Sequence, residues 1–401
     1  MFQEILALLL GLIAGTFTGL FPGIHVNLVA VFLLSLTPKL LNYTSPLSLA
    51  IFIVVISITH SFLDFIPSIF LGAPDEESFL SILPGHELLK EGKGYEAVVL
   101  TLYGSLVALI IIIIFIPVFI YILPSIQDAI SSIIPFILIF ISFFLIFREE
   151  NFLSSIIIFL LAGFLGIITF NLPVKEPLLP LLTGLFGSSA LIISLKNKSQ
   201  KIQKQIILPL KKIKLEKKQI LKSSLVASLT APICSFLPGI GSGHAATIAS
   251  EITKQDRRSF LFLLGIINTI VIALSFIAVY SINKTRSGAA VAVKEILKSI
   301  SSKDLTAIIM AIIISGILSF ILGIKMAKIA AASINKINYR TLSIITLSIL
   351  FIINLLFTNL IGILILLTAT SLGIFAILSN SRRINLMAAL LLPAIIFYLG
   401  N

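Results

Sequence analysis

The sequence is poor in cysteine, tryptophan and charge. It has one cysteine and no tryptophan, and only 11% of its 401 residues are Asp, Glu, Lys or Arg. A single cysteine excludes a small fold held together by disulfides. So few charged residues exclude a soluble domain, in which about a quarter of the residues are typically charged. Disorder is excluded for the opposite reason, because 58% of the residues are hydrophobic.

Long apolar runs indicate the class that remains. The run Ala108–Leu123, ALIIIIIFIPVFIYIL, does not alternate between apolar and polar residues, which excludes a transmembrane β-barrel. A spanning helix needs about 20 apolar residues. The sequence therefore predicts an all-α polytopic protein embedded in the lipid bilayer of the cell membrane. The expected spans are Leu47–Phe70, Ala97–Leu123, Ser125–Phe147, Phe152–Phe170, Pro177–Leu195, Ser259–Ile282, Asp304–Gly323, Thr341–Phe357, Asn359–Ser379 and Ile384–Leu399.

Two further apolar stretches are each interrupted by a Pro-Gly pair. Ile5–Leu41 contains Pro22–Gly23, and Gln219–Ile252 contains Pro238–Gly239, 216 residues further on. Proline removes a backbone donor and disfavours helix in the residue before it, while glycine permits a sharp reversal. Each stretch is therefore predicted to form helix, break, helix. The N-terminal sequence MFQEILALLLGL lacks a basic region and a clear cleavage site, so we interpret it as membrane segment and not as a removed signal peptide.

Positive charge is concentrated in one linker. Ten of the 29 Lys and Arg residues lie within Lys196–Lys222. The positive-inside rule places this segment in the cytoplasm, so the net charge of +12 does not indicate a nucleic-acid partner. The predicted units are a first membrane repeat, residues 1–195, a basic cytoplasmic linker, residues 196–218, and a second membrane repeat, residues 219–401.

The loop charges also predict the orientation of the two repeats. Lys254, Arg257 and Arg258 follow the second broken stretch and favour the cytoplasm, so this stretch enters and leaves on the same side. Counting crossings backwards from the linker, the first broken stretch is entered from outside. We therefore expect two inverted-topology repeats, each made of a Pro-Gly-broken helical hairpin and about five transmembrane helices.

Broken hairpins in inverted repeats point to transport. An interrupted backbone at membrane depth is tolerated only where protein or a water-filled cavity surrounds it, and paired discontinuous helices indicate a transporter binding site. The helix that restarts after each break offers free N–H groups to an anion. The alternative is a pair of kinks in ordinary packed helices. The expected substrate-binding residues are Pro22, Gly23, His25, Asn27, Pro238, Gly239, Gly241, Ser242, Gly243 and His244.

A second concentration of polar residues lies in Asp64–Ala97. His60 and Asp64 are four residues apart near the end of an apolar helix, so they share a face, where ionisable groups are costly and usually functional. A proton relay, a cation ligand and a satisfied bundle core are the alternatives for this pair. For Glu87, Glu91 and Glu96 we expect solvated charges. The candidates for coupling or a second site are His60, Asp64, Asp75, Pro84, Gly85, His86, Asn268 and Arg286.

Other chemistry is weakly indicated. No histidine pair has the short spacing of a helical zinc motif, and Cys234 is expected to pack as a small apolar residue. We therefore expect no metal, no catalytic residues and no cofactor beyond a coupling sodium ion or proton. Asn268 is either a ligand or the donor of an interhelical hydrogen bond.

The sequence resembles the TctA family, the large membrane subunit of tripartite tricarboxylate transporters, and in particular its archaeal single-protein branch. The similar segments are GTFTGLFPGIHVN, LGAPDEESFLSILPGHELLKEGKGYEAVVLTLYGS and APICSFLPGIGSGHAA. The resemblance implies a secondary transporter with inverted repeats, an anionic organic substrate and cation coupling. Bacterial relatives work with a small membrane subunit and a periplasmic binding protein, neither of which is evident in this chain. A homodimer is compatible with the sequence.

Two competing functions are retained. The same helix N-termini would suit the head of a lipid-linked phosphate such as a polyprenyl carrier, if a lateral opening admitted it. An intramembrane enzyme acting through His and Asp is the third reading, although the sequence has no G-x-S-x-G elbow.

Overall fold

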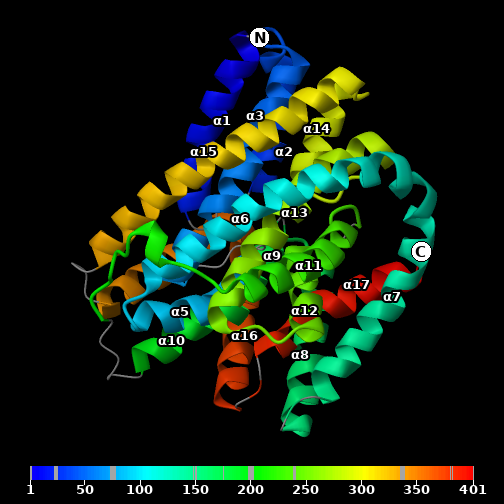
Figure 1. Ribbon diagram of the computed structural model, residues 1–401. Helices are drawn as coiled ribbons and strands as arrows, with labels where there is room; N and C mark the ends of the chain where they lie inside the picture. Colours follow the sequence, from blue (N-terminus) through cyan, green and yellow to red (C-terminus); the bar gives the residue numbers. More distant parts are fainter. Residues whose placement is uncertain are drawn as a thin grey trace.

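The computed structural model of the protein describes residues 2–21, 26–72, 78–147, 149, 151–174, 176–196, 203–237, 241–334, 339–379, 381 and 383–400. All regular secondary structure within these ranges is helical (Figure 1). The elements before the linker are α1 (Phe2–Leu20), α2 (Val26–Leu40), α3 (Pro46–Leu63), α4 (Phe65–Leu71), η1 (Phe79–Ser81), α5 (Ile82–Lys90), α6 (Gly94–Pro117), η2 (Val118–Ile122), α7 (Leu123–Phe147), α8 (Phe152–Asn171), α9 (Leu178–Leu182), η3 (Thr183–Ser188) and α10 (Ser189–Lys196). The later elements are η4 (Leu210–Lys212), α11 (Lys217–Cys234), α12 (Ser242–Ile252), α13 (Arg257–Ile282), α14 (Gly288–Leu297), α15 (Ser302–Ile334), α16 (Tyr339–Leu378), η5 (Arg383–Met387) and α17 (Ala388–Gly400).

Both predicted helix breaks are present. α1 ends at Leu20 and α2 begins at Val26, while α11 ends at Cys234 and α12 begins at Ser242. The two Pro-Gly pairs, residues 22–23 and 238–239, lie outside the described residues, as does His25. The sequence pattern therefore located the interruptions correctly to within a few residues of the helix ends.

The predicted spans are present as apolar helices, but their lengths differ from the expectation. Seven helices in the described ranges are long and apolar enough to cross a membrane, and the shorter apolar helices are Ser132–Phe144, Leu178–Ile193 and Asn385–Gly400. The first of these long helices is α1, and Ser343–Leu378 covers two predicted spans at once. Each of the ten predicted spans thus corresponds to an apolar helix or to part of one, although three of these helices are shorter than a full span.

One pair of predicted spans forms a continuous helical run. α6, η2 and α7 follow one another without a gap, and η2 is a π-helix that directly follows Pro117. Proline and π-turns bend helices without ending them, and Figure 1 shows this run crossing the molecule and then turning along one side. α16, in contrast, consists of two helices that meet at Asn359, whose φ of 60° and ψ of −166° are not helical, so the boundary predicted between Phe357 and Asn359 is confirmed.

α3 and α13 form the centre of the helical bundle. In the most apolar 18-residue stretch of each of these two spans, 94% of the residues are buried, against 33–44% in the other long helices. α1 packs on α3, and α11 packs on α13. The next long helix after each central helix packs on the other central helix: α6, which comes after α3 in the chain, packs on α13, and α15, which comes after α13, packs on α3. α8 with α17 and α10 with α16 are paired in the same exchanged way.

Close approach of the central helices depends on glycine. A Cβ on Gly265 of α13 would lie 2.0 Å from the Thr101 carbonyl oxygen of α6, and a Cβ on Gly104 of α6 would lie 2.1 Å from the Phe262 oxygen. In a membrane no hydrophobic force drives helices together, because the lipid tails are as apolar as the side chains. Helices therefore associate through close packing, which small residues allow. Ser105 adds a hydroxyl that donates to the Gly265 oxygen at 3.2 Å.

The described part of the basic linker packs against the turn between α5 and α6. The Gln205 side chain is buried, and its Nε2 donates to the Leu89 oxygen at 2.8 Å while its Oε1 accepts from the Gly94 N–H at 2.8 Å. The Ile206 N–H donates to the Gly92 oxygen at 2.9 Å. These bonds satisfy backbone groups at the end of α5 and in the turn that leads to α6. The linker therefore holds this turn in place.

Candidate functional site

The candidate site begins where α3 ends. Asp64 lies between α3 and α4, and its N–H donates to the His60 oxygen at 2.9 Å, so the two residues occupy successive turns of one helical path, as predicted. His60 is 3% exposed and Asp64 is 2% exposed. Taking a carboxylate out of water is costly unless it is paired or hydrogen-bonded, so this position needs polar neighbours.

His60 connects α3 to the end of α1. Its Nδ1 lies 3.2 Å from the Thr18 hydroxyl, and Thr18 is in the last turn of the helix that precedes the first break. The Thr18 hydroxyl donates to the Gly15 oxygen at 3.2 Å. With its proton used in this way, the hydroxyl accepts from His60, which places a ring proton on Nδ1.

Asn268 brings α13 to the same place. It is fully buried, and its Nδ2 donates to Asp64 Oδ2 at 3.4 Å and to the Ser61 oxygen at 3.3 Å. The interhelical hydrogen bond that the sequence left as one of two alternatives is therefore present. The Asn268 Oδ1 has no hydrogen-bond partner in the described part of the chain. Thr18, His60, Asp64 and Asn268, which we call the polar chain, thus join α1 and α3 to α13.

The second break carries a different arrangement. α12 begins at Ser242, and the Gly241 N–H donates to His244 Nδ1 at 3.2 Å. Because Nδ1 accepts, the proton of the neutral ring is on Nε2. Ser242, Gly243 and His244 are all buried. His244, the third residue of α12, thus caps the start of its own helix by accepting a hydrogen bond from the Gly241 N–H.

The remaining predicted residues fall into three groups. Pro84, Gly85 and His86 lie within α5, so this Pro-Gly pair does not interrupt a helix, because proline is tolerated in a first turn. Arg286 lies in the loop between α13 and α14 and acts electrostatically on Cys234, the last residue of α11. The other candidates are less fully placed: Asn27 is in the first turn of α2, and Pro22, Gly23, His25, Asp75, Pro238 and Gly239 lie outside the described residues.

The acids of α5 and α6 differ in their surroundings. Glu96 is 7% exposed and pairs with the Arg258 Nε at 2.7 Å, so the expectation of a solvated charge was wrong for this residue. Glu87 and Glu91 are partly exposed and both pair with Arg257, at 3.3 and 2.9 Å. Hydrogen bonds from Lys93 and Arg257 lower the pKa of Glu91. These pairs connect the α5–α6 region to the start of α13.

Sequence reasoning missed Arg383. Its Nη2 donates to the oxygens of Leu185 and Phe186 at 2.9 and 2.6 Å and to the Ser189 hydroxyl at 3.1 Å, and its guanidinium lies 5.4 Å from the centre of the Phe186 ring. Both carbonyls belong to η3, a π-helix whose widened turn gives them to an outside donor. Nothing in the sequence signals a π-helix, which is why this contact was not predicted.

A multi-pass helical protein with ionisable groups buried between its central helices belongs to the class of membrane transport proteins. The chain matches the Tripartite tricarboxylate transporter TctA family over residues 5–388 and belongs to that family, which is a family of transporters and not of enzymes. An uncharacterized protein of Methanocaldococcus jannaschii is 34% identical over 414 aligned residues, which cover 99% of each chain. No solved structure matches the chain. The protein is therefore a multi-pass membrane transporter, and the resemblance noted from its motifs is confirmed.

Proposed function

We propose that this protein is a secondary active transporter of a small carboxylate-bearing anion, driven by a sodium or proton gradient. Membership of the TctA family implies transport of tricarboxylate-like anions. The observation that carries the proposal further is the polar chain, in which a buried carboxylate, Asp64, lies between α3 and α13 and contacts Asn268. Ionisable groups inside a membrane bundle mark ion or substrate pathways.

The coupling ion is assigned to the Asp64 end of the polar chain. A carboxylate with an amide neighbour offers the oxygens that sodium prefers, and the same carboxylate can take up a proton, with His60 one turn away as relay. Coupling requires only that the ion and the substrate favour the same conformation. Because Asp64 and Asn268 come from different repeats, an ion at Asp64 would change the contact between α3 and α13.

The substrate is assigned to the two helix starts that follow the breaks. The residues proposed to bind it are Pro22, Gly23, His25, Asn27, Pro238, Gly239, Gly241, Ser242, Gly243 and His244. Two observations support the second helix start: the His244 ring carries its proton on Nε2, which is a suitable donor to a carboxylate, and the Arg286 charge acts close to the end of α11.

We further propose that residues 1–195 and 219–401 are inverted repeats joined by the linker. The exchanged packing supports this, since the pair α15 and α3 corresponds to the pair α6 and α13 when the repeats are interchanged. The pair α8 and α17 corresponds in the same way to α10 and α16. Such exchange is expected when one helical unit is duplicated around a pseudo-two-fold axis.

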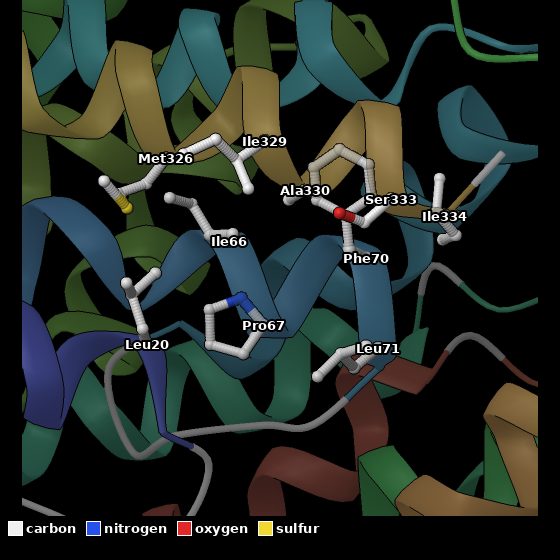
Figure 2. A pocket seen from close by; sticks show the side chains of 10 residues that line it. All are labelled: Leu20, Ile66, Pro67, Phe70, Leu71, Met326, Ile329, Ala330, Ser333 and Ile334. Carbon is white, nitrogen blue, oxygen red and sulfur yellow. The ribbon is translucent and has the colours of Figure 1, made fainter. Parts of the chain in front are cut away.

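A lipid-linked phosphate is the second candidate substrate, favoured by one groove. Figure 2 shows side chains of α1, α4 and α15 around a cavity of about 260 Å³ that begins at Leu20, next to the first break. Its lining is almost wholly apolar, which suits a prenyl chain, and the exposed Lys325 and Lys328 flank Met326 and Ile329 on α15 to receive the phosphate. The lining residues are Leu20, Ile66, Pro67, Phe70, Leu71, Met326, Ile329, Ala330, Ser333 and Ile334.

Uptake into proteoliposomes tests both substrates. The purified protein is reconstituted, and radiolabelled citrate, succinate and phosphate are supplied under an imposed sodium gradient, an imposed proton gradient, or neither. Gradient-dependent uptake of a carboxylate supports the leading proposal. Movement of a prenyl phosphate between leaflets, with no uptake of the soluble anions, supports the second candidate instead, and the absence of all movement contradicts both.

A further inference from the structure

A cluster of basic groups lies away from the polar chain, where α5 meets α10 and η5. The His86 ring is 7% exposed, and Nε2 has no hydrogen-bond partner among the described residues. A Cβ built on Gly72 would lie 2.9 Å from the His86 ring and 3.4 Å from Leu191 of α10. Leu191 is two residues beyond Ser189, which contacts Arg383, so the three elements meet at one place.

Among the described residues, Arg383 contributes a cation without an anionic partner. Its Nη2 donates to three neutral oxygens, and its buried Nε has no partner in the part of the chain that the structure describes. The charges of Arg383 and Lys90 both act on the His86 ring. A buried guanidinium without a carboxylate is costly, and an Arg fork is suited to a carboxylate or phosphate.

The nearby acid does not neutralise this cluster. Glu87 acts on Lys90, but it is also paired with Arg257 at 3.3 Å. Burial lowers the pKa of His86 to about 3, and the two neighbouring cations act in the same direction. His86 is therefore neutral and can offer a ring N–H, while Lys90 and Arg383 supply the charge.

We infer that His86, Lys90 and Arg383 form an anion-binding site for a carboxylate or phosphate group, separate from the polar chain. The backbone oxygens of η3 hold one edge of the Arg383 guanidinium and leave Nε for the ligand. The carbonyl oxygens of the π-helix thus position the guanidinium, a role that a carboxylate often has in a soluble protein. The ligand is either a soluble anion or the head of an anionic lipid, which share the same recognised group.

The test reads the site itself and not transport. Protein labelled with ¹⁵N-histidine is placed in phosphatidylcholine nanodiscs, and the ring signals of His86, assigned with His86→Gln, are followed during titration with citrate and with inorganic phosphate. We expect the His86 signals to shift on titration with at least one of them. A shift seen only in discs that contain phosphatidylglycerol assigns the site to a lipid head. Unmoved His86 signals in all of these conditions overturn the inference.

Two variants show whether the basic groups bind the anion. Lys90→Gln and Arg383→Lys are each expected to weaken the anion affinity read at His86 by tenfold or more. Lys303→Gln, which removes one charge from an exposed position in α15, is the control and should change the affinity less than twofold. If Lys90→Gln and Arg383→Lys lower thermal stability but leave the affinity unchanged, the cluster is purely structural. Asp64→Asn should keep this response even where it abolishes uptake, which separates a failure here from a failure of the proposed transport.

Discussion

The two central helices occupy corresponding places in the packing but carry different chemistry. α3 and α13 are equally buried, and each is covered by the helix that precedes a break. α3 leads to the titratable pair His60 and Asp64, whereas α13 contributes the neutral Asn268 to the same contact. The difference teaches that two helices can be packed alike while their chemistry differs. The ionisable groups of the polar chain lie on the side of α3.

The largest effect is expected from neutralising Asp64. Asp64→Asn keeps the size of the side chain but removes its charge, so that the contact with Asn268 joins two neutral amides. Ion coupling is typically worth about 1–3 kcal/mol, so we expect gradient-driven uptake in proteoliposomes to fall roughly 100-fold. Asp128→Asn, at a side chain that is 91% exposed, is the matched control and should transport normally. Uptake by Asp64→Asn within twofold of the native protein contradicts the assignment.

Removing the amide on α13 should have a smaller effect. Asn268→Ala deletes the donor to Asp64 and to the Ser61 oxygen. A hydrogen bond to a charged group contributes about 1.5–3 kcal/mol, and because the contact to Asp64 is 3.4 Å long we expect a loss of about tenfold in uptake, near the lower limit. Asn354→Ala is the control, since this equally buried amide donates to Leu350 of its own helix. Equal losses in the two variants would show that the effect is only structural.

The helix contacts can be compared by adding one methyl group. Gly265→Ala places a Cβ 2.0 Å from the Thr101 backbone oxygen of α6, whereas Gly15→Ala places one 2.6 Å from the Thr59 side chain and 2.9 Å from the Ile56 backbone oxygen of α3. The backbone contact is much closer at Gly265, and backbone shifts less readily than a side chain. We therefore expect Gly265→Ala to cost more than Gly15→Ala, within the range of about 1–3 kcal/mol that is typical of overpacking. Thermal unfolding in detergent measures both variants. Gly400→Ala, with nothing within 4 Å, should leave the midpoint unchanged, and a larger loss for Gly15→Ala would reverse our ranking.

The smallest effect is expected from a change at the start of α13. This helix begins with Arg257, whereas the start of α3 carries no charged residue. Glu91 pairs with Arg257, and its pKa is lowered from 4.5. A lowered pKa means that the carboxylate stabilises the fold above pH 4.5 and that this contribution is lost as the pH falls below that value. We expect Glu91→Gln to lower the midpoint slightly at pH 7 and by less as the pH falls from 4.5 through the lowered pKa of Glu91. A difference that does not shrink as the pH falls would show that charge is not its cause.

Much of the fold followed from the sequence because its signals are local. Apolar length placed the helices, and Pro-Gly pairs placed both interruptions between α1 and α2 and between α11 and α12. The division at Asn359 was foreseen, since two helices meet there across a non-helical residue. The continuous run α6–α7 was not foreseen, because a proline inside an apolar run ends a helix in some settings and only bends it in others.

The candidate site was predictable only in part. The spacing of His60 and Asp64 on an apolar helix was enough to select them. Their partners were not, because Thr18 and Asn268 are 42 and 204 residues away from His60 and Asp64 in sequence. Glu96 was misjudged because its charge is paired with Arg258 of α13, a distant segment of the chain. Contacts between distant segments leave no periodic signal, so a single sequence cannot reveal them.

The widened turn at Thr183–Ser188 has a consequence for how this family can vary in length. A π-turn holds one residue more than an α-turn, so a chain lacking one residue there could rewind and keep the helix on either side in register. Such a chain would return the carbonyls of Leu185 and Phe186 to the ordinary helical ladder. A homologue shortened at this point should therefore also have exchanged Arg383 for a residue that makes no demand on those oxygens.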